Sequence, residues 1–243
     1  MPILKLLFKR ETMAPMAALS FASAVSVAII LARVLFTGNI RYAFLIWNLF
    51  LAWLPLVFAI LARAKYQETK TGERLAWSFV GLSATWLLFF PNAAYICTDL
   101  VHLTNRFFGP FWVDLTMILS CAFTGLVLGF VSLYLMQSVI AHRYGRVTGW
   151  VFVASTTGLS SFGIYLGRFL RFNSWDVLAQ PGKLYQGISA AATGQGHPHQ
   201  FAFMLLFATF LFVSYLMLYA LTHLPTAMQM AATPVAPATP ARA

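Results

Sequence analysis

Six long apolar runs alternate with short polar or charged segments along the chain. A helix needs about 20 mostly apolar residues to cross a bilayer, and Pro, Gly, Asn or charged residues mark where it enters water. The runs that fit this pattern lie at about 13–36, 42–62, 75–91, 111–140, 148–167 and 200–224. The pattern therefore predicts six transmembrane helices.

The third run is the shortest of the six. It holds 16 residues from Leu75 to Phe90 before Pro91 interrupts it. A helix of that length covers roughly 24 Å, which is less than the roughly 30 Å of a hydrocarbon core. Either the helix continues, kinked, through Pro91, or the segment that follows completes the crossing.

Composition supports a membrane protein. Of the 243 residues, 60% are hydrophobic and only 9% are charged, against roughly 25% charged in an ordinary soluble domain. So few charges cannot cover a soluble domain, which excludes that class. We therefore expect an all-α fold, an integral membrane helical bundle that forms one polytopic domain over 1–224. The Ala-, Thr- and Pro-rich tail at 225–243 is expected to be disordered.

The charged residues predict an orientation. Because the basic residues lie mostly between the apolar runs, the net charge of +10 indicates topology and not nucleic-acid binding. With the N-terminus in the cytoplasm, ten Lys and Arg fall on the inner side and six on the outer side, so both termini are expected inside. Arg33, near the end of the first run, is expected to snorkel to the interface. Asp99, Asp114 and Asp176 then all lie outside.

The segment 93–106 carries polar residues at helical spacing and predicts an amphipathic helix. Its polar stripe would consist of Tyr95, Thr98, Asp99, His102 and Arg106. The stripe either lies in water at the membrane interface or turns toward the bundle and forms a site. In a site, an aspartate three residues before a histidine suits a carboxylate-oriented base or two ligands of a metal.

A second group of polar residues follows the fifth run. It consists of Arg168, Arg171, Asn173 and Asp176. The arginines are expected either to contact lipid phosphates or to pair with an aspartate. Under the predicted topology this group lies on the same side of the membrane as Asp99 and His102.

Small and hydroxylated residues within the runs have simpler interpretations. Two glycine pairs at four-residue spacing predict a close crossing of the fourth and fifth helices. The pairs are Gly125 with Gly129 and Gly163 with Gly167. The hydroxyl cluster at 155–161 favours helix packing, and its alternative is a polar conduit lined together with Asn48 beside the Pro55 kink.

Three sequence runs resemble a known family. They are NLFLAWLP at 48–55, PNAAYICTDLVH at 91–102 and GIYLGRFLRFNSWD at 163–176. Together they resemble a bacterial family of multi-span membrane proteins catalogued as domain of unknown function 1361, over about 43–212. The resemblance implies a protein of the bacterial inner membrane and carries over no activity. Ala94 stands where a second proline is expected, which leaves the turn after Asn92 less rigid.

These observations lead to the hypothesis of a polar site at the external membrane boundary, which recognises an anionic lipid or a small anion. The site residues are Asp99, His102, Arg168, Arg171 and Asp176, with Tyr95 and Asn173. Asp99 and His102 are the candidate catalytic pair and the candidate metal ligands, although no metal or cofactor is assigned. The expected partners are the bilayer, the anion and a second copy of the chain. The alternatives are a transporter, a metal-dependent enzyme acting on a lipid-linked substrate, and a structural partner without chemistry.

Overall fold

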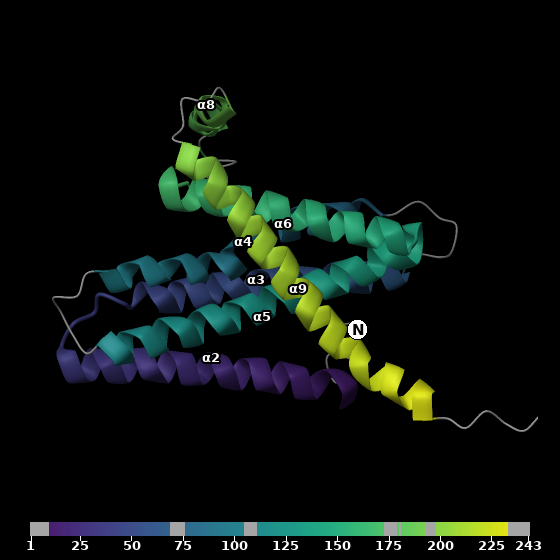
Figure 1. Ribbon diagram of the computed structural model, residues 1–243, viewed down its shortest axis with the longest axis horizontal. Helices are drawn as coiled ribbons and strands as arrows, with labels where there is room; N and C mark the ends of the chain where they lie inside the picture. The colour runs from purple at the N-terminus through teal and green to yellow at the C-terminus, as the bar shows by residue number, and fades with distance from the viewer. Residues whose placement is uncertain are drawn as a thin grey trace, which may run out of the picture.

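The computed structural model describes residues 10–68, 76–104, 111–172, 179, 181–192 and 198–232, and the regular elements in this part of the chain are helices. In chain order they are α2 (Arg10–Thr37), α3 (Phe44–Glu68), α4 (Trp77–Tyr95), η1 (Ile96–Thr104), α5 (Phe111–Tyr144), α6 (Arg146–Phe169), α8 (Pro181–Ala192) and α9 (Pro198–Ala232) (Figure 1). The element η1 is a 3-10 helix.

Within the residues that the structure describes, six stretches are long and apolar enough to cross a membrane. They are Met13–Thr37, Phe44–Glu68, Trp77–Leu103, Phe111–Tyr144, Arg146–Phe169 and Phe201–His223. A helix satisfies its own backbone hydrogen bonds, which is what a lipid environment requires. The prediction of an all-α membrane bundle with six spans is confirmed, and the chain is a multi-pass membrane protein.

The third span continues through its proline. α4 runs past Pro91 to Tyr95, and η1 extends the same span to Leu103. Both alternatives for this span therefore apply, because the helix continues through Pro91 and the segment that follows completes the crossing. The helix type over 93–106 is not the one expected, because a 3-10 helix replaces the α-helix from Ile96 onward. Such turns are common at the C-terminal ends of α-helices, and a polar stripe of two or three turns cannot distinguish a repeat of 3.0 residues from one of 3.6.

The glycine pairs of α5 and α6 pack against α4 instead of against each other. A Cβ atom on Gly125 would lie 2.7 Å from the carbonyl oxygen of Ala93, and one on Gly163 would lie 2.8 Å from Cγ of Pro91. α5 and α6 do contact each other, but the glycine pairs approach α4 and are not what brings these two helices together. The small size of these glycines lets two neighbouring backbones approach the segment that leads from Pro91 into η1, which fixes the position of η1 in the bundle.

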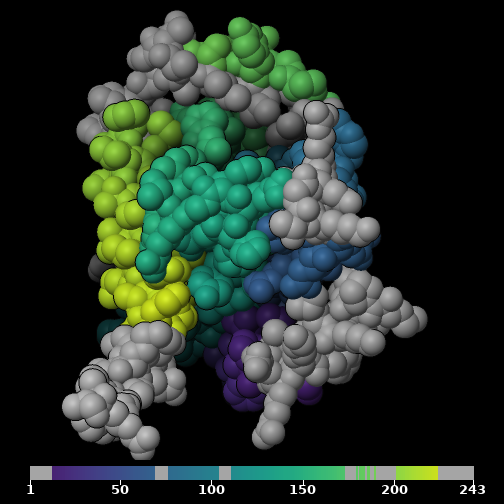
Figure 2. All heavy atoms as spheres, turned by 90° about the vertical axis from the view of Figure 1, so that its right-hand side faces the viewer, coloured from purple at the N-terminus to yellow at the C-terminus, as the bar shows by residue number. Residues whose placement is uncertain are grey.

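The helices form a bundle with two polar ends. α2 to α6 run back and forth along the long axis, and α9 crosses obliquely over them (Figure 1). Figure 2 views the end at which α5 turns into α6, with α9 in yellow on one flank and α2 in purple at the bottom. At the opposite end lie the α2–α3 turn, η1, the start of α5 and the end of α6. The residues expected to form the site lie at this second end.

The C-terminal helix extends past the expected start of the tail. α9 continues to Ala232, beyond residue 224. The rest of the predicted tail, 233–243, lies outside the described residues.

Candidate functional site

A buried carboxylate, Asp99, is the centre of the polar cluster. Asp99 is only 1% exposed, so it faces the bundle and not the water at the interface. Its Oδ1 accepts a hydrogen bond from Nη2 of Arg168 at 2.5 Å, and its Oδ2 accepts one from Nδ2 of Asn48 at 2.9 Å. Both oxygens are therefore satisfied, as a buried charge requires. Three spans meet here, because Asn48 comes from α3, Asp99 from η1 and Arg168 from α6.

The side chain of Arg168 is held by η1 on several sides. Its Nε and Nη2 atoms donate to Oγ1 of Thr98 at 3.0 and 2.6 Å. Thr98 donates its own hydroxyl hydrogen to the carbonyl of Tyr95 at 2.6 Å, which leaves its lone pairs for the guanidinium. The guanidinium carbon also lies 4.7 Å from the ring centroid of Tyr95, within the range of a cation–π contact. The 3-10 geometry makes this possible, because it brings residues three apart onto one line.

His102 lies beside the buried pair but is not part of its hydrogen bonds. Its Nε2 is 3.8 Å from Oδ1 of Asp99, which is too far for a hydrogen bond. The imidazole packs edge-on against the ring of Phe44 at 5.3 Å between centroids. Its side chain is 36% exposed, so one face of the ring is open to the adjoining cavity.

A cavity of about 930 Å³ adjoins the cluster between α3, α4 and α6. Its polar lining consists of Asn48, Asn92, Tyr95, Asp99, His102, Arg168 and Arg171. Its apolar lining includes Leu51, Ala84, Leu87, Leu88, Leu159 and Phe162. The cavity therefore has a charged end beside η1 and an apolar part deeper along the spans, which is the pattern of a site for a ligand with two kinds of surface.

Arg171 reaches the cavity through an unusual backbone conformation. It follows the end of α6 with a φ of 59°, in the left-handed region. A non-glycine residue there costs roughly 1–2 kcal/mol. The amide of Phe172 donates to the carbonyl of Leu166 at 3.1 Å and holds the turn in place. The side chain of Arg171 is exposed and lines the same cavity as Arg168.

The structure brings together five of the seven residues expected at the site. Tyr95, Asp99, His102, Arg168 and Arg171 line one cavity. Asn173 and Asp176 lie outside the described residues, as does Arg106. The sequence did not identify Asn48 as a partner of Asp99, and Asn48 was assigned to a conduit instead. The only feature of the sequence that could have indicated its role is that it is a polar residue within an apolar span.

The hydroxyl cluster of α6 shows packing contacts. Thr157 donates to backbone carbonyls of its own helix at 3.1 and 3.0 Å. Ser161 donates to the carbonyl of Met204 on α9 at 2.6 Å. Thr157 and Ser161 therefore make the contacts expected of helix packing, whereas the buried Oγ of Ser160 has no hydrogen-bond partner among the described residues.

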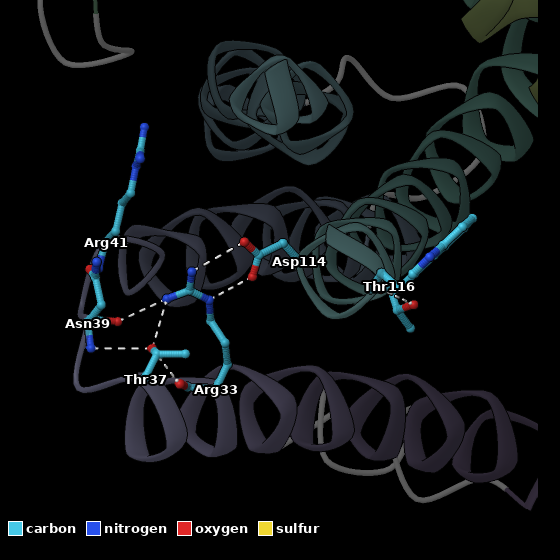
Figure 3. A network of polar contacts seen from close by, with 7 residues as sticks. Arg33, Thr37, Asn39, Arg41, Asp114 and Thr116 are labelled. Atoms are coloured by element: carbon cyan, nitrogen blue, oxygen red, sulfur yellow. Dashed lines mark hydrogen bonds and ion pairs between the residues drawn. The ribbon is translucent and has the colours of Figure 1, made fainter. Parts of the chain in front are cut away.

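Asp114 and Arg33 form a separate buried ion pair (Figure 3). Nε and Nη2 of Arg33 donate to the two oxygens of Asp114 at 2.7 and 3.2 Å, and Nη1 reaches Thr37 and the carbonyl of Asn39. The expectation that Arg33 snorkels is wrong, because it is 3% exposed. Its carbon Cζ lies 4.5 Å from the ring centroid of Tyr42. Burial raises the pKa of Tyr42, and the carboxylate of Asp114 raises it further.

The described residues offer few ligands for a metal. No group of three His, Cys, Asp or Glu side chains comes together among them. Asp99 and His102 are the nearest to such a group, and both oxygens of Asp99 already accept hydrogen bonds. Their arrangement suits a positioned arginine better than a bound cation.

Comparison with known proteins gives one match. The profile of a family described as "Protein of unknown function (DUF1361)" matches residues 47–214. No curated protein and no solved structure matches the chain. The matched range includes every described residue of the polar cluster.

Proposed function

The chain belongs to the family of proteins of unknown function DUF1361, and on that premise we propose that it is a membrane protein that binds an anionic group at the polar end of the cavity. The observation that carries the proposal is that Arg168 and Arg171 line one end of a single cavity. Asp99 neutralises one of these two guanidiniums. The other has no ion-pair partner among the described residues and can bind a phosphate or carboxylate, which arginine does through paired hydrogen bonds.

The roles within the site follow from burial. Asp99, Asn48 and Thr98 hold Arg168 in one position, so its guanidinium is preorganised and loses little freedom when a ligand binds. Arg171 is exposed and supplies the unneutralised charge. His102 lines the same cavity, and a ring N–H of its imidazole can donate a hydrogen bond to the anion.

Recognition is favoured over catalysis by the contacts of Asp99. A catalytic histidine is usually oriented by a carboxylate within hydrogen-bond reach. Here the carboxylate bonds Arg168 and Asn48, and His102 lies 3.8 Å away. The carboxylate therefore positions the arginine and not the imidazole.

We also propose that this site faces the outside of the bacterial inner membrane, with both termini in the cytoplasm. The excess of Lys and Arg at the other ends of the spans supports this orientation through the positive-inside rule. Six crossings bring the two ends of the membrane domain to the same side.

Lipid analysis of the purified protein tests the proposal. Wild-type protein in a mild detergent is expected to retain anionic phospholipid above its share in the source membrane, as measured by mass spectrometry. Arg171→Ala removes one charge-assisted contact worth about 1.5–3 kcal/mol, so retention should fall about tenfold or more. Arg146→Ala is the matched control, because Arg146 is an exposed arginine at the opposite end of the same helix. Equal retention by Arg171→Ala and wild type would overturn the proposal.

A further inference from the structure

The apolar part of the cavity extends far from the charged end. Ala84 of α4 and Asp99 of η1 line the same cavity. They are 15 residues apart, which corresponds to roughly 24 Å at about 1.5 Å per residue in α4 and about 2.0 Å per residue in η1. A small anion occupies only the charged end, so the length of the cavity calls for a ligand with an extended apolar portion.

The cavity also lies open along its length. α3 and α6 both pack on α4, so α4 forms the floor of a groove with α3 and α6 as its walls. On these walls, Trp47 and Leu159 line the cavity and are each 54% exposed. Both belong to candidate membrane spans, where an exposed side chain faces lipid. The groove is therefore accessible from within the bilayer.

We infer that the ligand is an amphiphile from the bilayer, with a phosphate-type headgroup at Arg168 and Arg171 and an alkyl chain along the groove toward Ala84. This inference rests on the proposed function and specifies its ligand class. Among the described residues that line this end, the guanidiniums of Arg168 and Arg171 outnumber the carboxylate of Asp99, and the resulting positive charge complements an anionic headgroup.

Membrane physics supports a lipid source. In a bilayer the alkyl chain exchanges lipid contacts for protein contacts, so the apolar groove orients a ligand more than it adds affinity. The charged end supplies the attraction, and the groove selects ligands whose chain can lie beneath the headgroup. A soluble anion would use only the charged end.

Two probes with the same headgroup separate these features. Oleoyl lysophosphatidic acid carries an alkyl chain, and glycerol 3-phosphate lacks one. We would measure the binding of each probe to the full chain in phosphatidylcholine nanodiscs. The concentration of lysophosphatidic acid is expressed as its mole fraction in the disc, so that its partitioning into the disc does not count as affinity. Ala84→Trp fills the groove at an exposed position. We expect it to weaken binding of lysophosphatidic acid about tenfold and to leave glycerol 3-phosphate unchanged.

Matched variants make the result specific. Ala154→Trp introduces the same side chain at an exposed position of α6 outside the cavity lining, and it should alter neither probe. Leu159→Trp narrows the groove from the α6 wall and should reproduce the effect of Ala84→Trp. Thermal unfolding of each variant shows that it is folded.

The outcomes distinguish this inference from the proposed function. If Arg171→Ala weakens both probes but neither tryptophan in the groove weakens lysophosphatidic acid, the anion site stands and the alkyl-chain inference is overturned. If Arg171→Ala weakens neither probe, the proposed function itself fails. Selective loss of lysophosphatidic acid in Ala84→Trp and Leu159→Trp supports the inference.

Discussion

The ion pair between Asp99 and Arg168 predicts an asymmetric loss of stability when its members are removed one at a time. Breaking a buried pair costs about 3–5 kcal/mol because one charge is left uncompensated. Arg168→Met strands the carboxylate of Asp99, which is 1% exposed and retains only the amide of Asn48. This variant should therefore lose about 5 kcal/mol of its free energy of unfolding, near the upper limit of that range.

The opposite substitution should cost less. Asp99→Leu strands the guanidinium of Arg168, whose side chain is 19% exposed and still bonded to Thr98 and stacked on Tyr95. We expect a loss of about 3 kcal/mol. The double variant removes both charges and should be more stable than Arg168→Met alone, since paired replacement by apolar residues is often close to neutral.

Unfolding by SDS in mixed micelles measures these differences in free energy. The loss in free energy of unfolding should be larger for Arg168→Met than for Asp99→Leu. The loss in the double variant should be well below the sum of the two single losses. Additive losses, or a larger loss for Asp99→Leu than for Arg168→Met, would refute the assignment of Asp99 as the buried member that depends on its partner.

Two further predictions concern packing and topology. Gly163→Ala places a Cβ 2.8 Å from Cγ of Pro91 and should lower the free energy of unfolding by about 1–3 kcal/mol, whereas Gly158→Ala meets nothing within 4 Å and should be neutral or stabilising by up to about 1 kcal/mol in the same SDS assay. In a cysteine-free background, Arg41→Cys should react with a membrane-impermeant maleimide in intact cells and Tyr144→Cys only after lysis. Both positions are exposed, at opposite ends of the bundle, and the reverse labelling pattern would contradict the proposed orientation.

Sequence reasoning succeeded where one physical rule dominates. The bilayer requires long apolar helices, so run length alone predicts the six spans. The length that a bilayer requires also explains why the third span continues past Pro91, and Gly163 of α6 packs closely against the proline ring.

The pairing of charges could not be read from the chain in the same way. Arg33 meets Asp114, which is 81 residues away, and Arg168 meets Asp99 at a separation of 69. The sequence predicts all four residues on one side of the membrane, but only the packing of α2 on α5 and of α6 on α4 decides which charges meet. The burial of Asp99 likewise depends on tertiary contacts that a polar stripe does not specify.

The inferred ligand is an anionic lipid that occupies the groove between α3 and α6. Photo-crosslinking tests this most directly, with an anionic phospholipid that carries a diazirine in its alkyl chain, followed by peptide mass spectrometry of the full chain. We predict adducts concentrated in the groove, at Trp47 and Leu159 on its walls and Leu88 on its floor, and their loss in Arg171→Ala. Adducts spread evenly over the lipid-facing surfaces of α5 and α9, and unchanged in Arg171→Ala, would contradict the account.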